Sequence, residues 1–309
     1  MSGRGGAPAG WAALGAVALL GLGLLWLLLS GQSTEGPVPI AVLAAVEPAP
    51  APRWAGASGY RMALLPAGTA QLGCTAGQGG RCADDERPAR AVTRSRALWV
   101  GETEVTQALW ERVLHVNPAG FAGCARCPVE GLSWTDAAAF ADALSAFDGL
   151  PPCYRISGEE VAWPEGLACL GYRLPTEAEW EAAARAGGDQ RFAGGDAALA
   201  VAWIEGNSAQ RTHPVGQKRP NALGLVDMSG GVWEWVWDWY GPYPADGAPE
   251  VDPLGPATGQ TRVRRGGAWL TSADFARVSA RFYFTPETAS DIVGLRLVRT
   301  AAPAEAAAL

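Results

Sequence analysis

Lysine and histidine are scarce in this sequence, and basic charge is in the minority. Lys218 is the only lysine, and His115 and His213 are the only histidines. Two histidines so far apart give a histidine-based metal centre too few ligands. The formal net charge is −7, so the chain lacks the basic surface with which proteins bind nucleic acids. We therefore expect no nucleic-acid partner.

Motifs of several common enzyme classes are also missing. The sequence contains no GxSxG elbow, no phosphate-binding loop and no HxxxH pair, which argues against the usual serine hydrolases, nucleotide-binding proteins and zinc proteases. The GQGG stretch at 77–80 is expected to be a loop beside a cysteine. The acidic cluster at 84–86 is expected to be a solvated turn.

A long uncharged stretch lies near the N-terminus. Arg4 precedes it, Glu35 follows it, and residues 11–30 are mostly apolar. At about 1.5 Å per residue, such a helix matches the bilayer core of about 30 Å. We predict a cytoplasmic segment at 1–10 and a transmembrane anchor, or an uncleaved signal, at 11–30; cleavage near Ser30 is the alternative. The positive-inside rule places the remainder outside the cytoplasm, at a bacterial inner membrane with a periplasmic or extracellular ectodomain.

The composition changes twice along the rest of the chain. Residues 31–58 are rich in proline and alanine and are predicted to be a linker. A folded domain is expected at 59–300, with its first strand at 61–66. The alanine-rich segment 301–309 is predicted to be a frayed tail.

Six cysteines all lie in the first part of this domain, at Cys74, Cys82, Cys124, Cys127, Cys153 and Cys169. An even number outside the cytoplasm indicates disulfides. Pairing of neighbours predicts Cys74–Cys82, Cys124–Cys127 and Cys153–Cys169. A zinc site is an alternative, but only one CxxC is present. A redox-active CxxC is another, although such a motif normally opens a helix and here Pro128 follows.

Three helices are indicated by their start signals. Capping boxes at 133–136 and 176–179 predict helices that end near Gly149 and at Gly187. A shorter helix is expected at 106–114. Few helices in a long segment rich in glycine, proline and isolated aromatics predict an α+β fold: one irregular domain of low regular secondary structure.

The tryptophan-rich stretch at 233–239 is the clearest strand signal. Four tryptophans alternate with other residues, which is the period of a β-strand with one indole-lined face. Glu234 and Asp238 fall between them. The simplest interpretation is a central core strand. A second interpretation is that Asp227 and Glu234 face a cation.

Seven motifs in order give the chain a family resemblance. It resembles the formylglycine-generating enzyme (sulfatase-modifying factor) family in these segments: DERPARAV (84–91), GETEVTQALWERV (101–113), VEGLSWTDAAAFADAL (129–144), YRLPTEAEWEAAARAG (172–187), NALGLVDMSGGVWEW (221–235), VRRGGAW (263–269) and VGLRLVR (293–299). The resemblance implies a single irregular domain related to the C-type-lectin-like fold.

The same resemblance implies a structural calcium site. The family's ligands correspond to side-chain oxygens of Asp227 and Glu234 and to backbone oxygens of Gly230 and Val232. Two carboxylates with turn carbonyls are what a hard cation requires. The alternative is that both carboxylates only accept backbone hydrogen bonds.

One part of the family pattern is missing. The family's enzymes oxidise a substrate cysteine to formylglycine with copper held by two cysteines, but residues 266–281 contain no cysteine. Thr271 stands at the first cysteine position, and the second falls among residues 273–276. Cu(I) requires thiolates or comparable soft ligands, so copper is not expected. Candidate pocket residues are Trp233, Ala268, Trp269 and Arg281.

These observations predict a membrane-anchored, extracytoplasmic member of the family without cysteine-to-formylglycine activity. As a binding or accessory module, it would take a peptide or an envelope component as its ligand. The alternative is an oxidoreductase with altered chemistry on a peptide or secondary metabolite. A formylglycine-generating oxidase with relocated cysteines is a third possibility.

Overall fold

The computed structural model describes residues 51–306. The strands are β1 (Arg53–Ala55), β2 (Arg61–Leu65), β3 (Gly68–Leu72), β4 (Arg90–Arg94), β5 (Leu98–Gly101), β6 (Arg155–Ser157), β7 (Glu160–Ala162), β8 (Tyr172–Arg173), β9 (Trp233–Trp239), β10 (Glu250–Val251), β11 (Arg262–Arg265), β12 (Phe282–Phe284), β13 (Val293–Gly294) and β14 (Val298–Thr300). The α-helices are α1 (Gln107–Leu114), α2 (Trp134–Phe147), α3 (Glu177–Arg185), α4 (Ala198–Val201) and α5 (Pro303–Ala306). Short 3₁₀ helices are η1 (Ala76–Gln78), η2 (Asp84–Glu86), η3 (Gly166–Ala168) and η4 (Ala273–Ala276).

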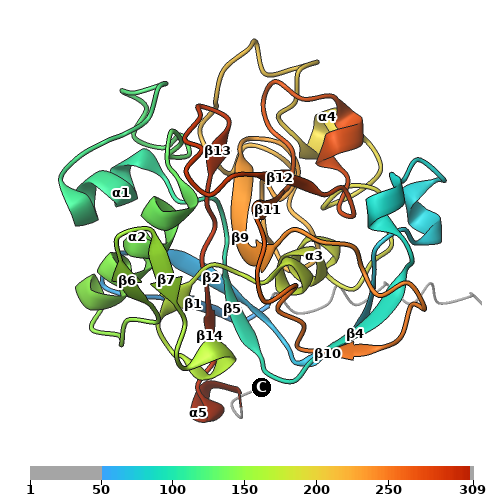
Figure 1. Cartoon of the computed structure of the whole chain (residues 1–309). Helices are drawn as coiled ribbons and strands as arrows, with labels where there is room; N and C mark the ends of the chain where they lie inside the picture. Colours follow the sequence, from blue (N-terminus) through green and yellow to red (C-terminus); the bar gives the residue numbers. More distant parts are fainter. Residues whose placement is uncertain (1–50, 307–309) are drawn as a thin grey trace, which may run out of the picture. The chain divides into compact units, whose positions relative to one another are not determined.

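Strand β9 lies between helices α2 and α3 in the middle of the fold (Figure 1). It pairs with β11 on one side and β13 on the other, in a four-stranded sheet of order β12-β11-β9-β13. The predicted alternation is present, because Trp233, Trp235 and Trp237 pack into one core cluster while Val236 packs into another. Both faces of β9 are therefore covered, and the strand separates two apolar cores.

The two faces of this sheet have different chemistry. The face that carries the tryptophans of β9, Arg262 and Arg264 of β11 and the phenylalanines of β12 is called here the aromatic face. The face that carries Glu234 and Asp238 of β9 and Arg265 of β11 is called the ionic face. Strand pairing sets this division, since Arg264 lies opposite Trp235 and Phe282, and Arg265 lies opposite Glu234.

The largest sheet has the order β1-β2-β5-β14-β8. Its edge strand β1 lies inside the segment predicted to be a linker, so the ordered fold begins before residue 59. Trp54 explains this early start: its ring lies 6.0 Å from that of Tyr172 and 6.5 Å from that of Trp99, and the Arg299 guanidinium stacks 4.1 Å from it. Trp54 thus fixes β1 to the domain, although the segment around it has the proline- and alanine-rich composition of a linker.

The helices begin where the sequence predicted. Ser133 and Thr176 form capping boxes with Asp136 and Glu179 at the starts of α2 and α3, and Thr106 caps α1. A side-chain oxygen that accepts an N–H from the first turn satisfies a donor with no partner inside the helix. Helix α3 ends with Ala186 in a left-handed conformation (φ 49°), just before the glycines expected to stop it.

All six cysteines form the three predicted disulfides, Cys74–Cys82, Cys124–Cys127 and Cys153–Cys169. No cysteine is free, so neither the zinc nor the dithiol interpretation applies to the structure. At the other end of the domain, α5 lies within the predicted tail because Glu305 pairs with Arg299 at 2.5 Å.

The predicted membrane span at 11–30 lies outside the described residues. Within residues 51–306, no helix combines the length and apolar character needed to cross a bilayer.

Candidate functional site

The candidate site is built around residues 266–281, called here the pocket segment. It follows β11 through Gly266 and Gly267, which have left-handed φ values of 98° and 79°. A methyl group on Gly267 would lie 3.0 Å from the Ala276 Cα, so the backbone passes there too closely for a side chain. The turn is tied to the tryptophan segment by hydrogen bonds from Gly230 N to Gly266 O (2.8 Å) and from Trp269 N to Gly231 O (2.8 Å).

Thr271 is committed to the backbone of the turn. Its Oγ1 accepts from Ala268 N at 2.9 Å and donates to Ala268 O at 3.0 Å. Helix η4, which holds the positions of the family's second cysteine, contains one aspartate, one phenylalanine and two alanines. This donor set fails the test for copper: the pocket segment has no thiolate, and every cysteine elsewhere is oxidised.

An aromatic cluster joins the pocket segment to the aromatic face. The Phe275 ring lies 6.4 Å from that of Trp233 and 5.8 Å from that of Phe282, and Trp233 and Phe282 are 5.5 Å apart. Phe284 lies 6.2 Å from Phe282. Phe275 is 42% exposed, and Leu270, in the same segment, is 43% exposed. The pocket segment therefore presents apolar side chains to solvent, and one of them, Phe275, packs on the buried Trp233.

Arg264 is enclosed by this cluster. Its guanidinium carbon lies 3.4 Å from the centroid of the Phe284 ring, 4.8 Å from that of Phe282 and 4.9 Å from that of Trp233. The residue is only 2% exposed, and its Nε and Nη1 are enclosed with no hydrogen-bond partner. Burial lowers the pKa of Arg264 to about 9, so the side chain remains mostly charged at neutral pH.

The four candidate pocket residues from the sequence do not all meet. Trp233 and Ala268 pack in one buried cluster. Trp269 lies edge-on to Phe121, with ring centroids 5.3 Å apart, and donates from Nε1 to Asp291 O at 3.0 Å. Arg281 lies on the other side of the β9 sheet, where it lines a cavity of about 450 Å³ together with Glu177 and Asp238.

This cavity, called here the polar cavity, gathers buried charge on the ionic side of the sheet. Arg281 forms two hydrogen bonds to Glu177, at 2.7 and 2.8 Å. Asp238 accepts from Glu177 N at 2.8 Å. Burial and the negative charge of Glu177 raise the pKa of Asp238 to about 8. Perturbed carboxyls in a cavity mark a possible functional site, but here Asp238 also caps the start of α3.

The residues expected to bind calcium lie at the start of β9. Asp227 has a left-handed φ of 60°. Its Oδ2 accepts from Gly216 N at 2.6 Å, while Oδ1 is buried without a partner. Glu234 is held between Arg296, at 2.8 Å, and the Trp180 indole N–H, at 2.5 Å. Hence the structure engages Glu234 with protein donors and leaves one oxygen of Asp227 free.

A third carboxylate in this region was not foreseen. Glu104 is buried and accepts from Val232 N at 2.9 Å. Burial, together with the negative charges of Asp227 and Glu234, raises the pKa of Glu104 well above its usual range. Within residues 51–306, no three histidine, cysteine, aspartate or glutamate side chains are grouped closely enough to hold a metal by themselves. The free Asp227 oxygen and the nearby negative charge nevertheless fit a hard cation that takes backbone oxygens as its other ligands.

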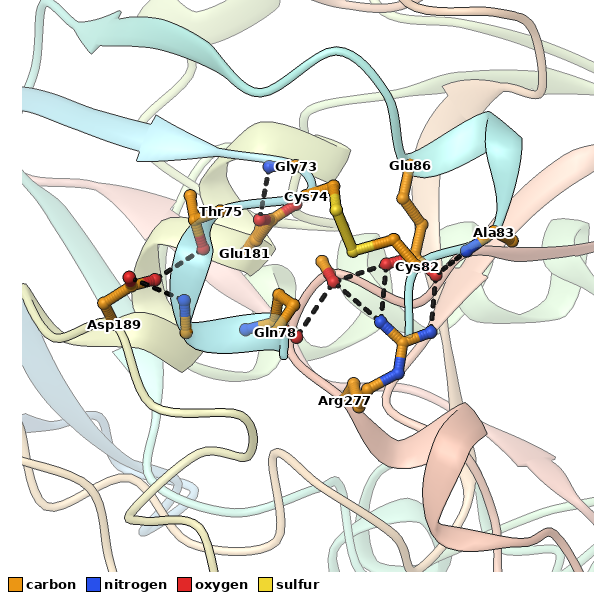
Figure 2. The surroundings of a disulfide bond; sticks show 12 residues. Gly73, Cys74, Thr75, Gln78, Cys82, Ala83, Glu86, Glu181, Asp189 and Arg277 are labelled. Atoms are coloured by element: carbon orange, nitrogen blue, oxygen red, sulfur yellow. Dashed lines mark hydrogen bonds and ion pairs between the residues drawn. A yellow bond between two sulfur atoms is a disulfide. The ribbon is translucent and has the colours of Figure 1, made fainter. Parts of the chain in front are cut away.

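An ion pair joins the pocket segment to the loop that contains the Cys74–Cys82 disulfide. Figure 2 shows Arg277 reaching Glu86 beside the Cys74–Cys82 bond. The two Arg277–Glu86 hydrogen bonds are 2.7 and 2.5 Å long. Burial alone would raise the pKa of Glu86, but the hydrogen bonds from Arg277 and Ser279 hold it below its usual value. The acidic cluster expected to be a solvated turn therefore contributes a buried ion pair.

Arg264 and Glu104 are the site residues that sequence reasoning missed. Arg264 was visible only as part of VRRGGAW, where alternate residues of a strand point to opposite faces. Glu104 was visible only as part of GETEVTQ. Neither motif indicates which of its charged side chains will find a counter-ion or a hydrogen-bond partner in the folded chain.

Comparisons with known proteins agree with this fold. The model of the sulfatase-modifying factor enzyme 1-like domain matches residues 48–301. A protein named chaperone protein LppX from Paenibacillus barcinonensis is 34% identical over 237 residues, which cover 66% of this chain and 80% of that protein. A formylglycine-generating enzyme from Streptomyces coelicolor is 34% identical over 304 residues, covering 84% of this chain and 94% of the enzyme.

Two solved structures share the architecture. Treponema denticola variable protein 1 superposes with a TM-score of 0.72 at 33% identity, over 81% of this chain and 99% of that one. PvdO from Pseudomonas aeruginosa superposes with a TM-score of 0.66 over 82% of this chain and 99% of that one. Because PvdO is only 24% identical, that likeness concerns the fold alone.

Proposed function

The chain belongs to the sulfatase-modifying factor enzyme 1-like domain family, and from this we propose that it is a membrane-anchored, extracytoplasmic binding or accessory module of that family, without cysteine-to-formylglycine activity. The observation that carries the proposal is the chemistry of the pocket segment. The hydroxyl of Thr271 is hydrogen-bonded to the backbone of Ala268, and residues 266–281 contain no cysteine that could supply a thiolate. A soft copper ion has no suitable ligands there.

The pocket segment can still bind a ligand without catalysing the oxidation of cysteine to formylglycine. Leu270 and Phe275 are exposed in the pocket segment, and Phe275 packs on the buried Trp233; exposed apolar groups with a rigid aromatic support are typical of recognition surfaces. The relative named as a chaperone is 34% identical to this chain, which supports an accessory role on another polypeptide. We take a peptide as the ligand, presented outside the cytoplasm.

Calcium is proposed as a structural ion. Asp227 and Glu234 would hold it through side-chain oxygens, and Gly230 and Val232 through backbone carbonyls. Bound there, the ion would supply positive charge among buried carboxylates and fix the turn that enters β9. The unpartnered Oδ1 of Asp227 supports this assignment.

An oxidoreductase with altered chemistry is the second candidate. The observation that favours it is the polar cavity, where the pKa of Asp238 lies at about 8. A carboxyl that is protonated near neutral pH is suited to proton transfer. Its substrate would be a peptide or a secondary metabolite.

The test measures turnover and binding on the same protein. The full-length chain, loaded with copper, is incubated with oxygen and a peptide carrying the sulfatase cysteine motif, and formylglycine is sought by mass spectrometry. The Streptomyces coelicolor enzyme is the positive control. We expect no turnover, and turnover above a metal-free control would overturn the proposal.

Binding is measured in parallel on an array of immobilised peptides. Phe275→Ala, in the pocket segment, should weaken capture. Leu199→Ala is the matched control, because Leu199 is a 58% exposed apolar residue outside the pocket segment. If the wild-type chain captures no peptide, or both variants lose capture equally, the module hypothesis fails.

Anchoring is tested separately with a reporter fused after Thr300. Activity of an extracytoplasmic reporter is expected. A reporter that is active only in the cytoplasm would contradict the proposed topology.

A further inference from the structure

Arg264 is a buried positive charge that the described part of the chain leaves without a negative partner. Its neighbours on β11 differ. Arg262 donates to Trp237 O at 2.5 Å, and Arg265 pairs with two glutamates. For the Arg264 side chain, residues 51–306 offer neither an ion pair nor a hydrogen bond, and its guanidinium lies against three aromatic rings.

Aromatic contacts alone do not offset this burial. A cation–π contact contributes about 0.5–2 kcal/mol, whereas removing an ion from water costs several kcal/mol even after the protein relaxes. A partner that arrives from outside would recover part of this cost. Such a partner must carry negative charge and an oxygen acceptor, because the guanidinium is a cation and Nη2, the one of its nitrogens that is not enclosed, is a hydrogen-bond donor.

The surroundings restrict the partner further. Phe275 is exposed and packs on Phe282 of the cluster that encloses Arg264, so an apolar group next to the negative charge would be buried by contact with it. Strand β12, which carries two of the rings around Arg264, is an edge strand: in the described residues it pairs on one side only, with β11. An open strand edge offers backbone hydrogen bonds to an extended peptide.

We propose that Arg264 and the aromatic cluster around it form a recognition site for an extended peptide with an acidic side chain flanked by apolar side chains. The peptide carboxylate binds the Arg264 guanidinium, and an apolar side chain next to it in the peptide packs on Phe275. The inference rests on the proposed function, because it names the class of peptide that the module takes.

The experiment compares matched peptides on the full-length chain. Six-residue peptides carry a central glutamate, glutamine or lysine, flanked by all combinations of alanine, leucine and phenylalanine. Affinity is measured by fluorescence anisotropy. A hydrogen-bonded pair with a charged group predicts that glutamate peptides bind about tenfold or more tightly than their glutamine partners, and lysine peptides more weakly than either.

Variants separate this inference from the proposed function. Arg264→Met should remove the preference for glutamate over glutamine. Arg262→Met, on the same strand and face, should keep the preference. Should Arg264→Met fail to fold, Arg264→Lys serves instead: it retains the charge, and we expect a reduced but measurable preference.

Each remaining outcome has a fixed meaning. If no peptide of any class binds the wild-type chain, the proposed function fails. If peptides bind without a preference for glutamate, or if Arg264→Met keeps that preference, the acidic-peptide inference fails while the module proposal stands. If phenylacetate competes as well as the matched peptide does, the site recognises an isolated carboxylate and the peptide assignment is overturned.

Discussion

Arg264 and Arg265 are consecutive residues of β11, yet they are buried in opposite ways. On the ionic face, Arg265 contacts Glu177 at 3.1 Å and Glu181 at 2.7 Å and donates to two backbone carbonyls. On the aromatic face, Arg264 has three aromatic rings and no carboxylate. One strand thus holds one cation with counter-ions and one without, although Nε of Arg265 also lacks a hydrogen-bond partner.

This difference separates a structural region from a candidate binding region. The charges on the ionic face have counter-ions inside the domain: Arg265 pairs with two glutamates of α3, and Glu234 pairs with Arg296. The aromatic face leaves Arg264 able to pair with a group from outside. Buried charges that have counter-ions hold segments in place, whereas a buried charge without one is a candidate recognition element.

The largest expected effect is the loss of Arg265. Arg265→Met leaves two buried glutamates with fewer partners, and removing one member of a buried ion pair costs about 3–5 kcal/mol. Equilibrium denaturation by urea should show this as a lower midpoint with an unchanged slope. Arg61→Met is the control, since its ion pair with Glu102 is solvent-exposed on the arginine side and should contribute about 1 kcal/mol or less.

The ionic face should also make stability depend on pH. Burial and Glu177 raise the pKa of Asp238 to about 8, against about 3.9 in an unfolded chain. The folded state therefore binds the extra proton, and Asp238 should make stability fall as the pH rises from about 4 to 8. Asp238→Asn should reduce that decline, measured as the free energy of unfolding at several pH values, and Glu104, whose pKa burial also raises, should account for part of what is left.

Glu177 provides the opposite trend in a separate pH range. Burial would raise its pKa, but Arg281 and Arg265 hold it below the usual value. Its contribution is present above the unfolded pKa of about 4.3 and is lost only as the pH falls below that value. If the decline between pH 4 and 8 persists in Asp238→Asn, another group causes it.

Removal of calcium tests whether the ion binds beside Glu234 of the ionic face. If calcium binds at Asp227, excess chelator should lower the melting temperature, because a ligand at about 100 times its dissociation constant stabilises the fold by about 2.7 kcal/mol. In Glu234→Gln, whose buried pair with Arg296 is weakened with or without the ion, the chelator should have little further effect. An unchanged melting temperature would mean that Asp227 and Glu234 serve only protein hydrogen bonds; magnesium added in place of calcium controls for ionic strength.

The smallest expected change in stability is for Arg264→Met. Replacing an uncompensated buried charge by an apolar side chain of similar length should shift the free energy of unfolding by about 1 kcal/mol or less. Denaturation under the conditions used for Arg265→Met gives a direct comparison. A loss as large as that of Arg265→Met would show that Arg264 is structural, and the contrast between the two faces would disappear.

Local patterns were sufficient for much of the fold. The capping boxes at Ser133 and Thr176, the alternation of β9 and the three disulfides between neighbouring cysteines all follow from residues close in sequence. Each depends on short-range geometry: a side chain reaches its own helix turn, a strand alternates its faces, and a short loop closes.

The pairing of charges and the true start of the domain depended on distant contacts. Strand β1 was hidden in a segment of linker composition because Trp54 finds Trp99, Tyr172 and Arg299 only in the folded chain. Glu86 was expected in solvent, yet it binds Arg277, which is far away in sequence. Composition cannot report such contacts, because it contains no information on which segments meet.

The sequence by itself determined the family, the irregular α+β fold and the absence of thiolates from the pocket segment, since these depend on residue identity and order. The tertiary structure alone decided which arginine of β11 has counter-ions. The electrostatic free energy of a buried charge depends on the distances to its neighbours and on its access to water. Arg264 and Arg265 are the same residue type in the same strand, and only the opposite directions of their side chains place one among carboxylates and the other among aromatic rings.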